Sequence, residues 1–462
     1  MNKEIFKAYD IRGIFNKSLS LDDVELIGYG LSKVLKKHKQ KNISVGYDGR
    51  NSGHKIYTRL SKALIDNGIN VININMVTTP MSYFSGIKYS NGNAVMITGS
   101  HNPPEYNGFK IMVKGSALSG SEVLEIYEFA TSKNKSNHID PSANEIIKNP
   151  FEEYLNFIGE SITLRKKLNV LIDCGNGVAG KYASKVYESI GCNVKCLYCE
   201  VDGTFPNHHP DPSKPENLKD LIKSLKNNQE YDIGFAFDGD ADRLGVVTKD
   251  GNVIYPDRQM ILFSKHVLKT KPNSPIIFDV KCSKNLNDAI IENNGVPIMY
   301  KTGHSLIKKK MKELNAPLGG EMSGHIFFND KWFGFDDGIY AGCRLLEILS
   351  NYNETPSEIL NNLPTSFTTP EINIDTIEGE NHSIINQMVN EISKKNNEFE
   401  NINFIDGIRI DFDFGFGLVR ASNTTPCLVL RFEATSAQKL DFIKSEFKKL
   451  LKNYMGNEKL DF

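Results

Sequence analysis

The sequence predicts an α/β protein of several layered domains that ends in a smaller α+β module. Strand-like apolar runs alternate with helical stretches through most of the chain, a pattern typical of helices packed on largely parallel sheets. The chain has 462 residues, enough for about three or four domains of ordinary size. From about residue 365 onward, short strands are followed by one long helix. These three observations predict an α/β fold with several cores.

The individual elements are predicted from local apolar runs and turns. A helix is expected near 56–67, and strands are expected over 43–47, 71–74, 94–97, 168–173, 231–237 and 275–279. In the final module, a helix over 437–454 is expected after strands near 408–412 and 427–432. Polar or turn-rich stretches lie at 132–150, 249–252 and 361–364. They divide the chain into four predicted domains, residues 1–149, 150–251, 252–364 and 365–462.

The composition limits the classes of partner. The chain has 55 basic and 56 acidic residues and a net charge of -1, which argues against a protein that coats nucleic acid. Hydrophobic residues make up 40% of the chain, which excludes a disordered chain. No apolar run approaches the roughly 18 residues that span a bilayer, and residues 1–7 lack the apolar core of a signal peptide. We therefore expect a cytoplasmic protein with no nucleic-acid partner, no membrane partner and no obligate protein partner.

The cysteines indicate a reducing compartment. Seven cysteines are scattered over the chain, an odd number that does not suggest a disulfide framework. Cys196 and Cys199 have the spacing of a metal-binding pair, and Cys192 precedes them. No second pair stands at zinc-ribbon distance, and residues 193–199 read as a strand. We therefore expect these cysteines to be ordinary packing residues.

Ser100 lies in a turn that contains Gly and Pro, residues 98–104, directly after the predicted strand 94–97. Open α/β sheets bind ligands at the carboxyl ends of their strands. A serine held there by stiff backbone could be a nucleophile or could carry a covalent group. The alternative is a hydrophilic turn between a strand and a helix. A Ser100–His101 hydrolase pair is disfavoured, because adjacent side chains are expected to diverge.

Three carboxylates alternate on the turn that follows the predicted strand 231–237. Asp238, Asp240 and Asp242 can converge on one hard cation through oxygen ligands. An EF-hand loop would need Gly at its sixth position and Glu at its twelfth, where this sequence has Arg243 and Lys249. Three ligands with open positions suit Mg²⁺, and the alternative is a solvated acidic turn.

Two later loops combine polar side chains. Residues 319–325 offer a carboxylate, a hydroxyl and an imidazole at Glu321, Ser323 and His325, a set that suits vicinal sugar hydroxyls. Residues 420–426 begin with Arg420 and continue with four hydroxyl or amide side chains, which suits a phosphate group. Taken singly, the 319–325 loop can equally be an ordinary polar turn, and a loop like 420–426 is more often a turn than a site.

A glycine-rich run at 175–181 matches the pattern GxxxxGK. A phosphate-binding P-loop needs Ser or Thr at the next position, where this chain has Tyr182. The run is therefore better interpreted as a turn than as a nucleotide site.

In combination, the four loops resemble those of the α-D-phosphohexomutases, and among them the bacterial phosphomannomutase/phosphoglucomutase group. The resemblance covers nearly the whole chain and includes the segments 8–13 (AYDIRG), 107–110 (NGFK), 173–177 (DCGNG), 279–281 (DVK), 301–305 (KTGHS) and 332–338 (WFGFDDG). It implies three related α/β/α domains with mixed sheets and a C-terminal α+β domain like the TATA-binding protein, arranged around a central cleft. Each domain would contribute one loop.

The resemblance also implies a role for each matching residue. Ser100 matches the phosphoserine, which shares the metal with Asp238, Asp240 and Asp242. Lys110 and Arg243 match cations beside the transferring phosphate. The matching substrate contacts are Tyr9, Arg12, Lys281, His304, Glu321, Met322, Ser323, Gly324, His325, Arg420, Ala421, Ser422, Asn423 and Thr424.

The implied activity is reversible phosphoryl transfer between the 1- and 6-positions of mannose and glucose phosphates. It would use Mg²⁺ and pass through a hexose 1,6-bisphosphate. Lys110 is the first candidate for proton transfer and His304 the second. The alternatives are a phosphoglucosamine mutase, a Mg²⁺-dependent sugar phosphatase and a non-catalytic protein that binds sugar phosphates.

Overall fold

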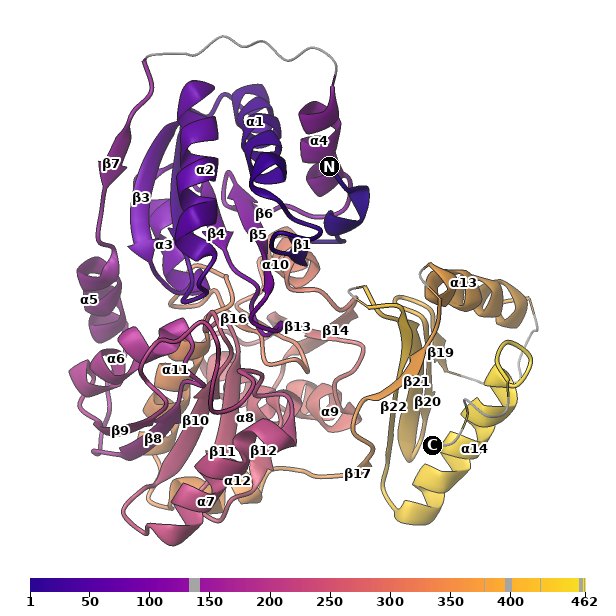
Figure 1. Ribbon diagram of the computed structural model, residues 1–462. Coiled ribbons are helices and arrows are strands. Elements are labelled where there is room, and N and C mark those ends of the chain that lie inside the picture. The colour runs from indigo at the N-terminus through magenta and orange to yellow at the C-terminus, as the bar shows by residue number, and fades with distance from the viewer. Residues whose placement is uncertain (133–141, 378, 395–400, 424, 457–459, 461) are drawn as a thin grey trace.

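Four β-sheets follow one another along the chain (Figure 1). The structure, a computed structural model, describes residues 1–132, 142–377, 379–394, 401–423, 425–456, 460 and 462. In the described residues, the first three sheets mix parallel and antiparallel strands, and the fourth sheet is antiparallel. This arrangement confirms the predicted fold class, three mixed α/β layers followed by an α+β module.

The first sheet contains β1 (Ile11–Ile14), β2 (Asn42–Tyr47), β3 (Asn70–Met76), β4 (Ala94–Ile97), β5 (Tyr106–Val113), β6 (Ser116–Ala117) and β7 (Glu145–Ile147). Its helices are α1 (Leu21–Lys37), α2 (Gly53–Asp66), α3 (Thr79–Tyr89) and α4 (Ser121–Thr131). The order is β1-β5-β4-β2-β3-β7, with β6 beside β5. Strand alternation directs Ile43 and Val45 to the face covered by α1, α2 and α4, whereas Ile72 and Ile74 pack on the side of α3.

The second sheet contains β8 (Asn169–Asp173), β9 (Asn193–Leu197), β10 (Ile233–Phe237), β11 (Leu244–Thr248) and β12 (Val253–Ile254). The helices around it are α5 (Phe151–Ser161), α6 (Ala183–Ser189) and α7 (Lys219–Asn227). The order is β12-β11-β10-β8-β9, with β8, β9 and β10 parallel. Leu171 and Ala236 face α7, and Ile172 and Phe235 face α6.

The third sheet contains β13 (Pro275–Asp279), β14 (Val296–Tyr300), β15 (Leu318–Gly320) and β16 (Ile326–Phe328), in the order β14-β13-β15-β16. Its helices are α8 (Pro256–Thr270), α9 (Lys284–Glu292), α10 (His304–Leu314) and α11 (Gly338–Ser350), and the following α12 (Pro356–Asn361) contacts β11 of the second sheet. Every residue of α11 is buried, and this helix contacts elements of both the second and the third sheet. The two layers therefore share one continuous core.

The fourth sheet contains β17 (Phe367–Thr368), β18 (Ile372–Asp375), β19 (Ile402–Asn403), β20 (Ile408–Phe412), β21 (Gly415–Ala421) and β22 (Cys427–Ala434). Its helices α13 (Glu380–Ile392) and α14 (Ala437–Leu451) lie on its outer side (Figure 1). In β21, Val419 and Ala421 belong to the core of this module, whereas Phe416 and Leu418 contact Val280 of the third layer. Because side chains alternate along a strand, Arg420 shares the inward face with Phe416 and Leu418.

Most of the predicted strands coincide with observed ones, since they are apolar runs buried between layers. The predicted helix 437–454 ends earlier, at Leu451, because the chain turns there and the Tyr454 hydroxyl donates a hydrogen bond to Glu391 of α13. Within the described ranges, no helix has the length and apolar character that crossing a membrane requires.

Candidate active site

The four loops singled out in the sequence occupy equivalent positions, since each joins two antiparallel neighbouring strands. The connected pairs are β4 and β5, β10 and β11, β15 and β16, and β21 and β22. The connection at Ser100 is therefore not the strand-to-helix turn offered above as the alternative. In the first three sheets, the loop follows the carboxyl end of a parallel strand, where α/β sheets present ligand-binding groups.

Ser100 is buried in a strained backbone conformation against the loop between β10 and β11, residues 238–243, here called the aspartate loop. Its φ of 49° lies in the left-handed region, which is uncommon for a residue with a side chain and often marks a functional site. The backbone N–H donates to Thr98 Oγ1 at 2.7 Å, and the hydroxyl donates to Asp238 Oδ2 at 2.8 Å. A side chain at Gly239 would collide with the carbonyl oxygen of Ser100. Glycine at that position therefore permits the close approach of the two loops.

Arg50 holds the backbone of the Ser100 loop, and sequence reasoning missed it. Its Nε lies 3.3 Å from Asp48 Oδ2, and both side chains are buried. Its terminal nitrogens donate to four backbone carbonyls of the loop, those of Ser100, Asn102, Pro103 and Tyr106. The only available signal was the position of Arg50, shortly after the predicted strand 43–47.

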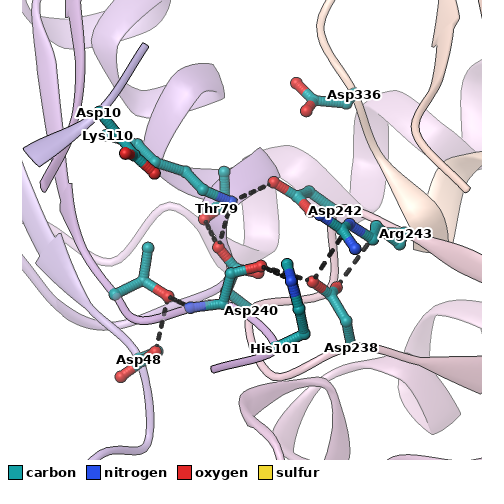
Figure 2. Close-up of polar contacts among 12 residues, drawn as sticks. Asp10, Asp48, Thr79, His101, Lys110, Asp238, Asp240, Asp242, Arg243 and Asp336 are labelled. Carbon is teal, nitrogen blue, oxygen red and sulfur yellow. Dashed lines mark hydrogen bonds and ion pairs between the residues drawn. The ribbon is translucent and has the colours of Figure 1, made fainter. Parts of the chain in front are cut away.

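The three aspartates converge as predicted. Asp238, Asp240 and Asp242 are fully buried, and one carboxylate oxygen of each lies within 4.8 Å of the others. The ammonium of Lys110, on β5, lies 2.7 Å from Asp240 Oδ2 and 2.5 Å from Asp242 Oδ2 (Figure 2). Oδ1 of Asp240 and Oδ1 of Asp242 are buried without a hydrogen-bond partner among the described residues. Buried polar atoms seldom lack partners, so this group of oxygens fits a hard cation such as Mg²⁺.

The crowded carboxylates perturb one another. Burial, with Asp240 and Asp242 nearby, raises the pKa of Asp238 well above its ordinary value. Burial also disfavours the charged form of Asp240, but the ammonium of Lys110 outweighs it and lowers the pKa of that carboxyl. The same pairing raises the pKa of Lys110 although burial opposes it. Lys110, which the resemblance places beside a transferring phosphate, compensates the buried negative charge of Asp240 and Asp242 in this structure.

Groups from the third layer complete this side of the site. Arg243 Nε donates to His325 Nε2 at 3.0 Å, and His325 Nδ1 lies 2.9 Å from Asp336 Oδ2. The ring of His304 stacks on that of His325, with centroids 5.4 Å apart. Burial, with Lys308 nearby, lowers the pKa of His304 well below its ordinary value, so its imidazole is neutral near pH 7. Sequence reasoning did not select Asp336, although it lies in the segment 332–338.

The predicted sugar loop is organised around Glu321. This buried carboxylate accepts a hydrogen bond from the backbone N–H of Gly303 and one of 3.3 Å from the Ser323 hydroxyl. Gly324 has a φ of 101°, a region that favours glycine, and the side chain of Met322 is half-buried. Glu321, Met322, Ser323 and Gly324 therefore form one tight turn between β15 and β16.

The other expected substrate contacts are brought to the same region, but several are already paired. Arg12 donates to Asn102 of the Ser100 loop at 2.6 Å, and the ring of Tyr9 meets that of His304 edge-on at 5.1 Å. Lys281 is buried, and its Nζ donates to Glu371 Oε1 at 2.6 Å. Glu371 was not singled out in the sequence, because it lies far from Lys281 along the chain.

The Arg420 loop contains a buried guanidinium, one nitrogen of which lacks a hydrogen-bond partner among the described residues. Arg420 Nε donates to Asp406 Oδ2 at 2.9 Å, whereas its Nη2 is buried without a hydrogen-bond partner among the described residues. The hydroxyl of Ser422 lies 2.9 Å from that of Thr425, and Asn423 Nδ2 lies 3.5 Å from the carbonyl oxygen of Thr302. Ala421 is the last residue of β21, and Thr424 lies outside the described residues. An unpartnered buried guanidinium N–H suits an anion.

The structure corrects the expectation that the side chains of Ser100 and His101 diverge. His101 Nδ1 lies 3.2 Å from Ser100 Oγ, because the left-handed backbone at Ser100 brings the two consecutive side chains together. Burial, with Arg243 nearby, lowers the pKa of His101 well below its ordinary value. A neutral imidazole therefore lies against the Ser100 hydroxyl.

The structure also corrects the expectation for two cysteines. Cys196 and Cys199 are joined in a disulfide and are not free packing residues. β9 ends at Leu197, and a left-handed residue, Tyr198 (φ 53°), turns the chain so that Cys199 returns to Cys196. The run 175–181 does form a turn, which leads into a short 3-10 helix, Val178–Lys181, and not into a long helix.

These features define an α/β enzyme whose candidate active site is assembled from the loops of four sheets and contains carboxylates able to hold a metal ion. Family models of phosphoglucomutase/phosphomannomutase match the chain in four parts, the α/β/α domains I, II and III at 3–137, 152–251 and 255–367 and the C-terminal domain at 371–450. The chain belongs to the phosphoglucomutase/phosphomannomutase family.

Individual relatives agree with this assignment. A phosphoglucomutase of Neisseria meningitidis serogroup A is 51% identical over 454 residues, which cover 98% of this chain and 97% of the relative. A phosphomannomutase/phosphoglucomutase of Pseudomonas aeruginosa is 46% identical over 448 residues, 97% of this chain and 95% of the relative. A crystal structure of a family member from Burkholderia thailandensis superposes with a TM-score of 0.91 at 42% identity, covering 98% of both chains.

Proposed function

We propose that the protein catalyses reversible phosphoryl transfer between the 1- and 6-positions of hexose phosphates, with mannose and glucose phosphates as substrates. The observation that carries the proposal is the buried Ser100 hydroxyl, which is hydrogen-bonded to Asp238 beside the other loops. A hexose phosphate cannot bring its own phosphate to its other end, so the reaction needs a phosphoryl donor on the protein. Relatives named phosphoglucomutase and phosphomannomutase/phosphoglucomutase support this reading.

Phosphorylated Ser100 transfers its phosphoryl group to the free hydroxyl of the bound sugar. The bond from phosphorus to Ser100 Oγ breaks and a bond to the sugar oxygen forms. The sugar hydroxyl loses its proton to a base, and Ser100 Oγ takes up a proton to become a hydroxyl again. The product is a hexose 1,6-bisphosphate, which turns end over end and returns its other phosphate to Ser100. Glucose 1,6-bisphosphate added from outside would therefore prime an unphosphorylated protein.

Asp238, Asp240 and Asp242, with an oxygen of phosphorylated Ser100, would hold Mg²⁺, which when bound offsets the negative charge of the transferring group. Two protein cations stand beside them. Arg243 Nε lies 3.9 Å from Asp238 Oδ2, and Lys110 lies between Asp240 and Asp242. Positive charge fixed in a buried site stabilises a phosphoryl transition state more than charge in water does.

For the proton transfer, the two candidates are Lys110 and His304. The imidazole of His304 is buried and neutral, so it can accept a proton near pH 7. In the metal-free protein, two carboxylates hold the ammonium of Lys110 protonated, which makes it a poor acceptor in that state. Mg²⁺ on the same carboxylates would weaken this effect, so Lys110 and His304 both stay candidates for the base.

The end-over-end turn of the bisphosphate gives a role to the two remaining loops, those of Arg420 and Glu321. Arg420 would bind whichever phosphate is idle, through the Nη2 corner that has no protein partner among the described residues. Glu321 and Ser323 would bind the hydroxyls at C3 and C4, which exchange places when the sugar flips. The further residues proposed to contact the sugar phosphate are Tyr9, Arg12, Lys281, Met322, Gly324, His325, Ala421, Ser422, Asn423 and Thr424. Discrimination at C2 would then be weak, which is why we expect both sugars to react.

The proposal includes four domains, 1–149, 150–251, 252–364 and 365–462, and a cytoplasmic location.

A phosphoglucosamine mutase is the second candidate function. Met322 and the run 422–424 favour the mannose and glucose group. A sugar phosphatase would not need the Arg420 loop, and a non-catalytic binding protein would not need three convergent carboxylates.

The test is turnover of glucose 1-phosphate with Mg²⁺ and a trace of glucose 1,6-bisphosphate, followed by ³¹P NMR. Glucose 6-phosphate should accumulate with the wild-type protein and not with Ser100→Ala. Ser264→Ala is the matched control, since its hydroxyl is also buried but has no hydrogen-bond partner in the described part of the chain. Inorganic phosphate in place of glucose 6-phosphate would indicate a phosphatase. Equal rates with Ser100→Ala would remove Ser100 from the mechanism.

A further inference from the structure

Three cysteine sulfurs meet at the carboxyl ends of β8 and β9, outside the candidate active site. Cys174 directly follows β8, Cys196 belongs to β9, and Cys199 follows the turn at Tyr198. Cys196 and Cys199 form a disulfide across a Cα–Cα distance of 6.0 Å, which a disulfide bridges without moving the backbone. Cys174 Sγ lies 3.5 Å from Cys199 Sγ and 3.9 Å from Cys196 Sγ.

The three sulfurs differ in access. Cys174 is fully buried, whereas Cys196 and Cys199 are partly exposed. Burial raises the pKa of the Cys174 thiol well above its ordinary value, so this sulfur stays protonated and is a weak nucleophile. A small molecule from solution can therefore reach the Cys196–Cys199 pair. The buried thiol of Cys174 packs against this pair and is unreactive toward solvent thiols.

A metal site is the rival use of three sulfurs. Structural zinc sites take four ligands, and in the part of the chain that the structure describes no fourth His, Cys, Asp or Glu atom joins these three. Cys174 would also have to ionise in buried surroundings to act as a ligand. The geometry and the chemistry favour a redox pair over a metal.

The disulfide lies at one end of a short chain of backbone contacts that leads to the aspartate loop. The backbone N–H of Cys174 donates to Leu197 at 3.1 Å, and that of Asn176 donates to Tyr198 at 2.9 Å. From the same turn, the N–H of Val178 donates to the carbonyl of Gly239 at 3.2 Å. Residues 174–178 therefore connect the 196–199 turn to the loop that carries Asp238 and Asp240.

We propose that Cys196 and Cys199 are a reversible dithiol–disulfide site for small thiols and disulfides of the glutathione class, and that the disulfide braces the 174–178 turn behind the aspartate loop. On reduction, two small thiols give their hydrogens to the two cysteine sulfurs. The protein S–S bond breaks as one S–S bond forms between the small molecules. Oxidation is the reverse exchange. The inference stands independently of the proposed function, since it rests on contacts outside the reacting groups.

The first test equilibrates the whole protein with reduced or oxidised glutathione, then counts thiols after rapid alkylation in denaturant. The chain has seven cysteines, so the reduced form should show seven thiols and the oxidised form two fewer. Peptide mass spectrometry should find Cys196 linked to Cys199. The double variant Cys196→Ser/Cys199→Ser should lose no thiols on oxidation, and Cys174→Ser should still form the disulfide.

The second test compares hydrogen–deuterium exchange of a peptide that spans 174–180 in the two redox forms. Exchange should be slower in the oxidised protein, and the double variant should show no difference between the two conditions. The site is refuted if seven thiols survive oxidation, if Cys174 enters the disulfide, or if one equivalent of added Zn²⁺ protects three thiols of the reduced protein. Equal exchange in both redox forms would overturn the bracing role.

Discussion

The ammonium of Lys110 lies 2.7 Å from Asp240 and 2.5 Å from Asp242, so a lysine of the first sheet neutralises two carboxylates of the second. All three side chains are buried, and an uncompensated buried charge is strongly destabilising. The contact therefore joins two layers of the fold as well as two groups of the candidate active site. Its energetic role can be measured without any substrate.

Replacing Lys110 by methionine should destabilise the metal-free protein by about 3–5 kcal/mol, because two buried carboxylates, Asp240 and Asp242, lose their cation. Mg²⁺ should stabilise this variant more than it stabilises the wild type, because the ion and Lys110 neutralise the same oxygens. Thermal unfolding in EDTA and in saturating Mg²⁺ measures both effects. Lys55→Met, on the exposed side of α2, is the control. Equal Mg²⁺ shifts in the wild type and the Lys110→Met variant would refute the shared role.

Arg50→Lys should lower kcat by about 10- to 100-fold, because lysine cannot reproduce the fork that binds four carbonyls of the Ser100 loop. KM should change less, since Arg50 is not a proposed substrate contact. Steady-state kinetics with glucose 1-phosphate gives both constants. Arg59→Lys, in an exposed pair with Glu25, should retain wild-type kinetics. A fully active Arg50→Lys protein would mean that the loop needs no such clamp.

The site and the fold differ in how far the sequence predicts them. Residues clustered within one loop, such as Asp238, Asp240 and Asp242, were found because their chemistry is visible at short spacing. Arg50, Asp336 and Glu371 act on partners that are distant along the chain, and only the packing of layers brings them together. His101 was misjudged because the left-handed backbone at Ser100 is not encoded by a glycine. The strands were predicted more readily, since burial between two layers requires continuous apolar runs.

Arg420→Lys should raise KM for glucose 1-phosphate by about tenfold or more and leave kcat less affected, since an idle phosphate is bound alike in the ground and transition states. The physical reason is that the buried Nη2 group of the guanidinium can donate to the phosphate, and lysine has no such group. Arg165→Lys, at an exposed position, serves as the control. An unchanged KM would separate the Arg420 loop from phosphate binding.

The carboxyl of Asp337 should make stability depend on pH. It accepts hydrogen bonds of 2.9 Å from the backbone N–H of Tyr340 and from the Tyr154 hydroxyl, and burial raises its pKa to about 7. The folded pKa exceeds the unfolded value of 3.8, so the contribution to stability is fully present below pH 3.8 and is lost as the pH rises to about 7.

Asp337→Asn keeps an acceptor for Tyr340 and removes the titration. Relative to the wild type, the variant should gain about 4 kcal/mol of stability between pH 4 and pH 8. Denaturant unfolding at several pH values measures this difference. Parallel pH profiles for the two proteins would show that Asp337 does not titrate in this range.

The most direct measurement of the central claim is the location of a phosphoryl group after incubation with glucose 1,6-bisphosphate and Mg²⁺. Peptide mass spectrometry should find one phosphoryl group, on Ser100, and transfer of that group to added glucose 6-phosphate should regenerate the bisphosphate. Ser100→Ala should remain unmodified, whereas Ser264→Ala should be labelled like the wild type. A phosphoryl group on another residue, or full mutase turnover by a protein never phosphorylated on Ser100, would contradict the account.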